Sequence, residues 1–217
     1  VLTFAEADML KLRGGGEYTI DEKGKEFALV VLYGTINVKG EDFCFENVGI
    51  RKSVFDGVGE TVYVGKDTEF TVRAGDAKIC IAKAPADRYY KPQVLKTADI
   101  KTKTLGKDSF LRTAAFNLAE NAEANLLYIG EFWVENGKWA SFPPHKHDVD
   151  DMPAEGFLDE IYYYEFDRPQ GFGVQMVYSA DKDLDKAYKV VSGDFVEIPK
   201  GYHPFSVAPG YKNYCLW

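Results

Sequence analysis

Short runs in which apolar and polar residues alternate recur along the whole chain. A period of two is typical of β-strands that have one buried and one exposed face. Gly, Asn and Asp separate the runs at turn sequences such as Glu135-Asn136-Gly137 and Ser192-Gly193-Asp194. The pattern predicts an all-β sandwich or barrel whose strands cover 26–32, 61–64, 70–72, 78–82, 126–134, 158–166, 172–178, 195–198 and 214–217.

A polar stretch rich in Lys and Thr, from about 85 to 111, separates two halves of the chain. Segment 62–69 aligns with 196–203, and the match resumes after Pro204. Glu69 then takes the place of His203, and the first half contains no histidine. This repeat predicts a duplicated β domain with a histidine site in the second copy only. A chance similarity between two hairpins is the alternative.

All three histidines lie in the last third of the chain, at His145, His147 and His203. Residues i and i+2 of an extended segment face the same side, so His145 and His147 would point into one space while Lys146 points away. His203 follows the turn Pro199-Lys200-Gly201. Imidazoles that converge in this way are typical ligands of a divalent metal ion.

A carboxylate is the expected fourth ligand. Alternation along 158–166 places Glu160 on the same face as Leu158 and Phe166, which suggests that this face is interior. A buried carboxylate needs a cation or hydrogen-bond donors, so Glu160 is our preferred ligand. The alternatives are that Asp159 faces inward while Glu160 is solvated, or that Glu155 in the preceding loop binds the metal.

These motifs resemble two families, one nested in the other. His145-x-His147, a later inward Glu160 and the segment 193–203 with its late histidine resemble the signature motifs of the cupin superfamily. The segments 142–148, 159–164, 169–175 and 199–211 look like the 5-deoxy-glucuronate isomerase family of myo-inositol catabolism. In the first half, 51–57 and 61–72 also resemble that family.

The resemblance implies two cupin-type β-barrel (jelly-roll) domains in tandem, a bicupin. We expect an N-terminal barrel without metal ligands at 1–88, a linker or crossing segment at 89–124, and a metal-binding barrel at 125–217. It also implies one divalent metal ion (Zn, Mn or Fe) held by His145, His147, Glu160 and His203. The expected reaction is the aldose–ketose isomerisation of 5-deoxy-D-glucuronate to 5-dehydro-2-deoxy-D-gluconate.

Five further residues are candidates for contact with this substrate. Tyr162 and Tyr164 share the predicted face of Glu160, and they either relay protons or are plain core aromatics. Arg112 is our first choice for the substrate carboxylate and Arg51 the second, because a guanidinium matches two oxygens; a surface role is the alternative for both. Gln175 either binds a sugar hydroxyl or is a polar strand-edge residue.

Composition narrows the function classes. A net charge of −8 argues against a nucleic-acid partner but permits a small anionic sugar acid as substrate. No apolar run is long enough to span a bilayer, and no signal peptide is recognisable, so we expect a cytoplasmic protein without a membrane partner. Cys44, Cys80 and Cys215 are expected as buried free thiols. Barrel edges and aromatic content favour a homo-oligomer.

Other functions remain open at this point. A related isomerase of 5-keto-4-deoxyuronate shares the metal motifs, and a cupin dioxygenase would use the same ligands with iron and oxygen. A sugar-binding or storage cupin would not depend on the metal ligands, and the intact set of four speaks against it.

Overall fold

The computed structural model describes residues 2–217. Within them it is almost entirely β: sixteen strands and two single-turn 3-10 helices are present, with no α-helix. Neither 3-10 helix in this range has the length and hydropathy needed to cross a membrane. The elements are β1 (Glu6–Ile20), β2 (Lys25–Gly40), β3 (Cys44–Val48), β4 (Thr61–Val64), β5 (Phe70–Pro85), β6 (Gln93–Leu95), η1 (Thr97–Asp99), β7 (Lys101–Leu105), η2 (Asp108–Phe110), β8 (Arg112–Leu118), β9 (Ile129–Glu135), β10 (Trp139–Ala140), β11 (Glu160–Phe166), β12 (Gly173–Tyr178), β13 (Asp185–Val190), β14 (Phe195–Ile198), β15 (Phe205–Val207) and β16 (Lys212–Leu216).

The strands of residues 2–217 form three sheets. One has the order β1-β5-β2-β4-β6, with β3 also paired to β2; the second is β10-β15-β12-β13; the third is β14-β11-β16-β9-β8-β7. The chain divides into two compact units. The N-terminal unit comprises 4–101 and 115–130, and the C-terminal unit comprises 102–114 and 131–217 together with residues 2 and 3.

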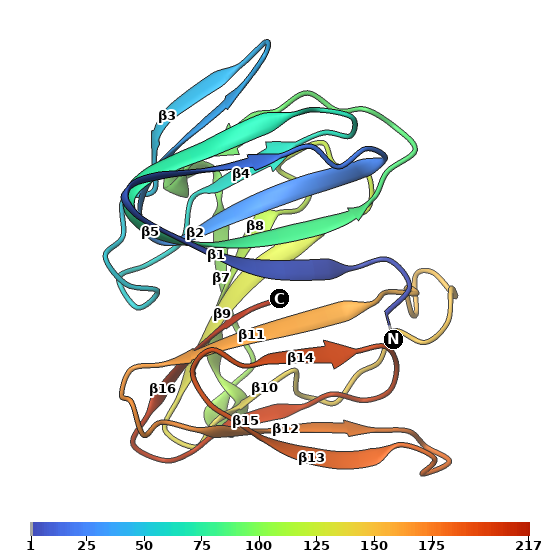
Figure 1. Ribbon diagram of the computed structural model, residues 1–217. Helices are drawn as coiled ribbons and strands as arrows, with labels where there is room; N and C mark the ends of the chain where they lie inside the picture. Colours follow the sequence, from blue (N-terminus) through green and yellow to red (C-terminus); the bar gives the residue numbers. More distant parts are fainter. Residues whose placement is uncertain (1) are drawn as a thin grey trace. The chain divides into compact units, whose positions relative to one another are not determined.

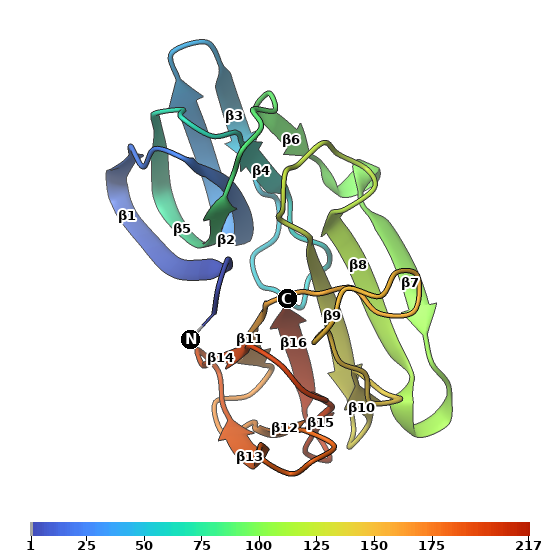
Figure 2. The ribbon, with the colours of Figure 1, turned by 90° about the vertical axis from the view of Figure 1, so that its right-hand side faces the viewer.

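The N-terminal unit is built on the long strands β2 and β5, which pair with each other along most of their length. The register of β2 shifts between Val31 and Tyr33 and again between Gly34 and Ile36. Gly34 has a positive φ, and a Cβ there would collide with the carbonyl oxygen of Asp76. Bulges bend a strand and increase its twist, which agrees with the strong curl of β1, β2 and β5 in Figure 2.

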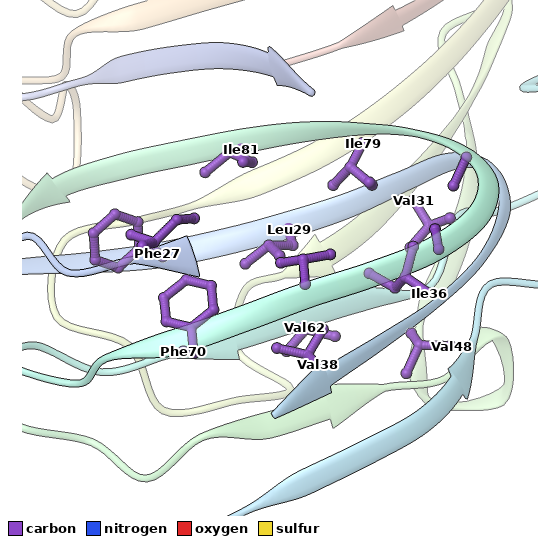
Figure 3. Close-up of a cluster of buried hydrophobic side chains, with 14 of the residues drawn as sticks. Phe27, Leu29, Val31, Ile36, Val38, Val48, Val62, Phe70, Ile79 and Ile81 are labelled. Carbon is purple, nitrogen blue, oxygen red and sulfur yellow. The ribbon is translucent and has the colours of Figure 1, made fainter. Parts of the chain in front are cut away.

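The core of this unit lies inside the curl. Alternate residues of β2 and β5 point into it, and the rings of Phe27 and Phe70 meet edge to face at a centroid distance of 5.4 Å. Figure 3 shows these two rings together with the aliphatic side chains around them. The period-two pattern of the sequence therefore produces a closed apolar interior here.

The interior of the C-terminal unit is lined by aromatic rings from two sheets. Phe205 of β15 lies 5.0 Å from Tyr164 of β11 and 6.3 Å from Phe132 of β9, measured between ring centroids. In Figure 1, β11 and β14 form one layer of this unit, and β12, β13 and β15 form the other. The candidate metal ligands come from this unit.

The all-β prediction is confirmed, and every predicted strand overlaps an observed one. Three details differ. The predicted strands at 70–72 and 78–82 are parts of one strand, β5, because the chain continues through the bulged region without a turn. Leu158 lies outside β11 and is exposed, so it does not mark an interior face. Cys44 is exposed, whereas Cys80 and Cys215 are buried as expected.

The predicted domain boundaries differ from the limits of the compact units. Residues 89–101 and 115–124 of the expected linker belong to the N-terminal unit, and 102–114 belong to the C-terminal unit. The division into barrels at 1–88 and 125–217 stays a prediction.

Candidate metal centre

The three histidines lie together in the C-terminal unit. One nitrogen from each of His145, His147 and His203 can be chosen so that all three lie within 4.8 Å of one another. The ring centroids are 4.7 Å apart for His145 and His203, and 5.2 Å for His145 and His147. Three imidazoles at this spacing could hold a metal ion.

The histidine pair is not on a regular strand, as the alternation argument assumed. Residues 142–148 form an irregular segment after β10, and it contains a cis peptide bond between Phe142 and Pro143. His145 and His147 nevertheless face the same side, since both rings lie beside that of His203. His203 follows β14 and the turn at Gly201, and its side chain is buried.

Glu160 is the first residue of β11 and faces the histidines. Its Oε2 atom lies 2.8 Å from Nε2 of His203 and 3.8 Å from Nε2 of His147. The strand register explains this position, because Glu160 pairs with Ile198 of β14, five residues before His203. Asp159, the alternative inward residue, instead accepts a hydrogen bond from the backbone N–H of Thr3.

The ring of His203 has a defined orientation. Its Nδ1 atom lies 2.9 Å from the carbonyl oxygen of Gly201 and can only act as the donor there. In a neutral imidazole Nε2 is then an acceptor, yet it faces the carboxylate oxygen of Glu160. Both of these buried atoms lack a hydrogen-bond partner of good geometry. A cation between two such acceptors would satisfy both, so the residues fit a bound metal ion.

Glu160 and His203 shift each other's pKa. Burial opposes ionisation of Glu160, but its contact with His203 and the nearby imidazoles lower its pKa overall. Burial would lower the pKa of His203, but the carboxylate of Glu160 outweighs it and raises that pKa. His145 is exposed as a residue, yet desolvation of its ring and the charge of His203 lower its pKa.

Glu155 has a different role from Glu160. Its carboxylate accepts hydrogen bonds from Nζ of Lys146 at 2.7 Å and from the backbone N–H groups of Asp148 and Val149 at 2.6 and 3.0 Å. These contacts close the loop between the histidine pair and β11. They use the carboxylate within the loop, which favours Glu160 over Glu155 as a ligand.

The two candidate tyrosines differ in their hydroxyl partners. The hydroxyl of Tyr162 lies 2.8 Å from Oγ of Ser141, and its ring packs 5.8 Å from that of His203. The hydroxyl of Tyr164 donates to Oε1 of Gln175 at 2.6 Å. Burial raises the pKa of both tyrosines well above the ordinary value, so both are neutral hydroxyls near neutral pH.

Gln175 is fully buried on β12, and both polar atoms of its amide form hydrogen bonds. Besides accepting from Tyr164, it donates through Nε2 to the carbonyl oxygens of His203 and Met176, each at 2.8 Å. These bonds favour a supporting role for Gln175 in holding the backbone of His203 over a contact with a sugar hydroxyl.

The two candidate arginines lie in different units. Arg112 starts β8 in the C-terminal unit, and its Nη1 donates to the carbonyl oxygens of Phe142 and Phe110 at 3.4 and 3.5 Å. Arg112 forms no ion pair within residues 2–217. Arg51 is buried in the N-terminal unit and donates to the carbonyl oxygens of Val31 and Gly57, which favours a structural role.

Two residues of the site were not among the sequence candidates. Ser141 contacts Tyr162, and Asp148 accepts a hydrogen bond from the backbone N–H of Gly201. Both lie within four residues of a histidine. They are in loops, however, where no alternation of apolar and polar residues predicts which way a side chain points. The proximity to the HxH motif was the only signal.

Comparisons with known proteins place the chain in a family. The KduI/IolB family matches residues 1–217. The 5-deoxy-glucuronate isomerases of Bacillus subtilis subsp. natto and Bacillus licheniformis are each 37% identical to this chain over 99% of its length, and it covers 80% of theirs.

Solved structures agree. An IolB-like protein from Salmonella typhimurium LT2 superimposes with a TM-score of 0.95 at 32% identity, covering 98% of this chain and 82% of that one. An oxalate decarboxylase from Lactobacillus farciminis gives a TM-score of 0.69 at 9% identity, covering 98% of this chain and 75% of that one, and supports the cupin fold alone. The full-length family match and the identity to these relatives confirm the resemblance, and the chain belongs to the KduI/IolB family.

Proposed function

We propose that this protein is a metal-dependent isomerase that converts 5-deoxy-D-glucuronate to 5-dehydro-2-deoxy-D-gluconate. The substrate is supported by relatives of 37% identity that are named 5-deoxy-glucuronate isomerase. The metal is supported by the three histidines that lie close enough together to bind an ion. The observation that carries the proposal is the cluster of three imidazoles with the carboxylate of Glu160, whose Oε2 faces Nε2 of His203 at 2.8 Å.

In this proposal one divalent ion is held by His145, His147, Glu160 and His203. Three neutral ligands and one carboxylate leave a net positive charge at the site. When bound, the ion would act as a Lewis acid on the substrate carbonyl and the neighbouring hydroxyl, and so favour transfer of a proton between adjacent carbons. Zn, Mn and Fe all accept ligands of this kind.

Arg112 is the proposed contact of the substrate carboxylate. Its guanidinium has five N–H donors, and only two long hydrogen bonds to carbonyl oxygens occupy it among residues 2–217. It lies close enough to Tyr162 that its charge opposes the burial that raises the pKa of this tyrosine. A carboxylate bound here would lie beside the histidine cluster.

Tyr162 is the proposed hydroxyl donor to the substrate. Its neutral hydroxyl shares a hydrogen bond with Ser141, and its ring contacts that of His203. Because its pKa is raised, it can donate a hydrogen bond at neutral pH but is a poor base. Tyr164 is expected to act indirectly, through Gln175.

The test is an anaerobic assay on the full chain. We expect the purified protein to contain about one divalent ion per chain, to lose activity after treatment with a chelator and to regain it with Mn²⁺ or Zn²⁺. Product formation from 5-deoxy-D-glucuronate is followed by NMR. His203→Ala should lose both the metal and turnover, whereas Lys182→Ala, in an exposed loop of the same unit, should keep both.

Three results would contradict the proposal. Substantial turnover by metal-free His203→Ala protein would remove the metal from the mechanism. Faster conversion of 5-keto-4-deoxyuronate than of 5-deoxy-D-glucuronate would assign the related isomerase activity. Oxygen uptake with a strict requirement for Fe²⁺ would assign a dioxygenase instead.

A further inference from the structure

Two separate segments carry the histidines, and one hydrogen bond joins them. The first segment contains His145 and His147, and the second is the turn that ends at His203. Oδ1 of Asp148, directly after the histidine pair, accepts a hydrogen bond of 2.6 Å from the backbone N–H of Gly201. The two residues are 53 positions apart in sequence.

Gly201 is held in place from its other side as well. Its φ is +90°, and a Cβ at this position would lie 2.8 Å from the carbonyl oxygen of Tyr178. The next residue, Tyr202, exchanges two backbone hydrogen bonds with Tyr178, of 2.8 and 2.9 Å. The turn is therefore fixed between the end of β12 and the carboxylate of Asp148, and only glycine fits at 201.

The position of Gly201 determines the orientation of the third imidazole. Its carbonyl oxygen accepts a hydrogen bond from Nδ1 of His203 at 2.9 Å, and this bond turns Nε2 towards Glu160. Asp148 thus orients the ring of His203 indirectly, through its hydrogen bond to Gly201. A hydrogen bond to the ring nitrogen that does not bind the metal fixes the tautomer and the ring orientation of a ligating histidine.

Asp148 is itself held by the loop that follows it. Its backbone N–H donates to Oε1 of Glu155 at 2.6 Å, and Glu155 also binds Nζ of Lys146. The backbone N–H of Leu158 donates to the carbonyl oxygen of His147 at 3.2 Å, so the loop closes on the histidine pair. The carboxylate of Asp148 therefore projects from a closed loop and is directed at Gly201.

We propose that Asp148 is a positioning residue that sets the distance and orientation of His203 relative to His145 and His147, and thereby the affinity of the site for a divalent ion. This inference rests on the metal centre of the proposed function. Asp148 is not proposed as a ligand, because its Oδ1 is bound to Gly201 and its Oδ2 lies 3.7 Å from Nζ of Lys146.

The test is titration of the metal-free full chain with Co²⁺ alone, monitored by the visible absorption bands of the bound ion. For Asp148→Ala we expect affinity to fall by about 10- to 100-fold, as for other losses of an outer partner, with altered band positions. Asp148→Asn should recover most of the affinity, since its side-chain oxygen can still accept from Gly201. Asp150→Ala is the matched control: it removes the same charge two residues away, where the side chain is exposed.

The melting temperature of each metal-free variant shows whether the fold is retained, and a folded Asp148→Ala protein is required for the comparison. If that variant does not fold, Asp148→Leu gives the comparison instead, because its side chain is of similar size but has no acceptor for the N–H of Gly201. Equal affinity and spectra for Asp148→Ala and Asp150→Ala would overturn the role of Asp148 while leaving the isomerase proposal intact. A wild-type protein that binds no Co²⁺ would overturn the metal centre and this inference together. Absence of turnover in a wild-type protein that binds Co²⁺ would count against the isomerase alone.

Discussion

Oε2 of Glu160 and Nε2 of His203 face each other at 2.8 Å, and both are buried. The sheet creates this pair, because Glu160 starts β11 opposite Ile198, the last residue of β14. The turn after β14 then brings His203 back over the start of β11. Two hydrogen-bond acceptors at this distance are stabilised by a cation between them. We therefore place Glu160 and His203 at the centre of the proposed metal site.

Replacement of Glu160 tests which carboxylate is the fourth ligand. Glu160→Gln keeps the shape but removes the charge, so we expect metal content after dialysis to fall at least about tenfold and turnover to fall with it. Glu155→Gln should keep its metal, because Glu155 binds Lys146 and backbone N–H groups of the loop. Elemental analysis and the isomerase assay give both quantities.

Glu155→Gln is the matched control for Glu160→Gln, because both variants replace a glutamate near the histidines by glutamine. If Glu155→Gln loses the metal and Glu160→Gln retains it, the ligand assignment from the strand position is wrong. A loss in both variants would indicate that closure of the loop matters as much as the carboxylate ligand.

The sequence was sufficient for the fold class and for the histidine cluster. Alternation along the strands predicts an all-β protein, and the HxH motif with a late histidine predicts the three imidazoles. Glu160 was chosen for a partly incorrect reason: Leu158, taken as a mark of the interior, is exposed. The residue faces the histidines because of its pairing with β14, and strand register is not readable from alternation alone.

Residues that support the site were harder to predict. Gln175 is bound to Tyr164 and His203, and Asp148 to Gly201, across 11 to 53 positions of sequence. Such contacts depend on tertiary structure, and neither a period nor a motif records them. The length of β2 was also underestimated, because the bulges within it interrupt the alternation of apolar and polar residues and so resemble the end of a strand.

Arg112 is expected to determine substrate affinity. Loss of its charge in Arg112→Met should raise KM by about 10- to 100-fold, corresponding to one or two charge-assisted hydrogen bonds. Arg112→Lys should be intermediate, because an ammonium group lacks the planar fork. Arg168→Met removes an exposed arginine of the same unit and should leave KM unchanged. An unchanged KM in Arg112→Met would exclude Arg112 as the carboxylate contact.

Gln175 is expected to contribute stability, whether or not metal is bound. Gln175→Leu leaves the hydroxyl of Tyr164 and the carbonyl oxygen of His203 without their buried partner, and we expect a loss of about 2 to 4 kcal/mol in the free energy of unfolding. Tyr164→Phe removes only one of these bonds and should cost about 1 kcal/mol. Urea unfolding of the metal-free proteins measures both. Unchanged stability in Gln175→Leu, with a raised KM, would instead support contact with the sugar.

Lys83 of β5 is expected to stabilise the N-terminal unit in a pH-dependent manner. Its Nζ atom lies 3.1 Å from Glu22, 3.3 Å from Asp8 and 3.5 Å from Glu6. Hydrogen bonds with Lys83 and Lys25 outweigh desolvation and lower the pKa of Glu22 and Glu6, while the carboxylates outweigh desolvation and raise the pKa of Lys83.

The directions of these pKa shifts determine the pH range in which the ion pairs of Lys83 stabilise the fold. A lowered carboxylate pKa gives stability that is present above the unfolded value of 4.5 and is lost as pH falls through the folded value. A raised lysine pKa gives stability that is present below 10.5 and is lost as pH rises through the folded value. Lys83→Met should therefore reduce the free energy of unfolding most between about pH 5 and 10, and by no more than about 1 kcal/mol because the carboxylates are solvent-exposed.

Chemical denaturation of wild type and Lys83→Met at pH 3, 7 and 9 tests this range. The difference between the two proteins should be largest at pH 7 and 9 and smaller at pH 3, because Glu6 and Glu22 lose their charge as pH falls through their lowered pKa values. Lys11→Met, on the exposed face of β1, is the control and should match wild type at each pH. A Lys83→Met deficit that is as large at pH 3 as at pH 7 would mean that the ion pairs of Lys83 do not provide the stability.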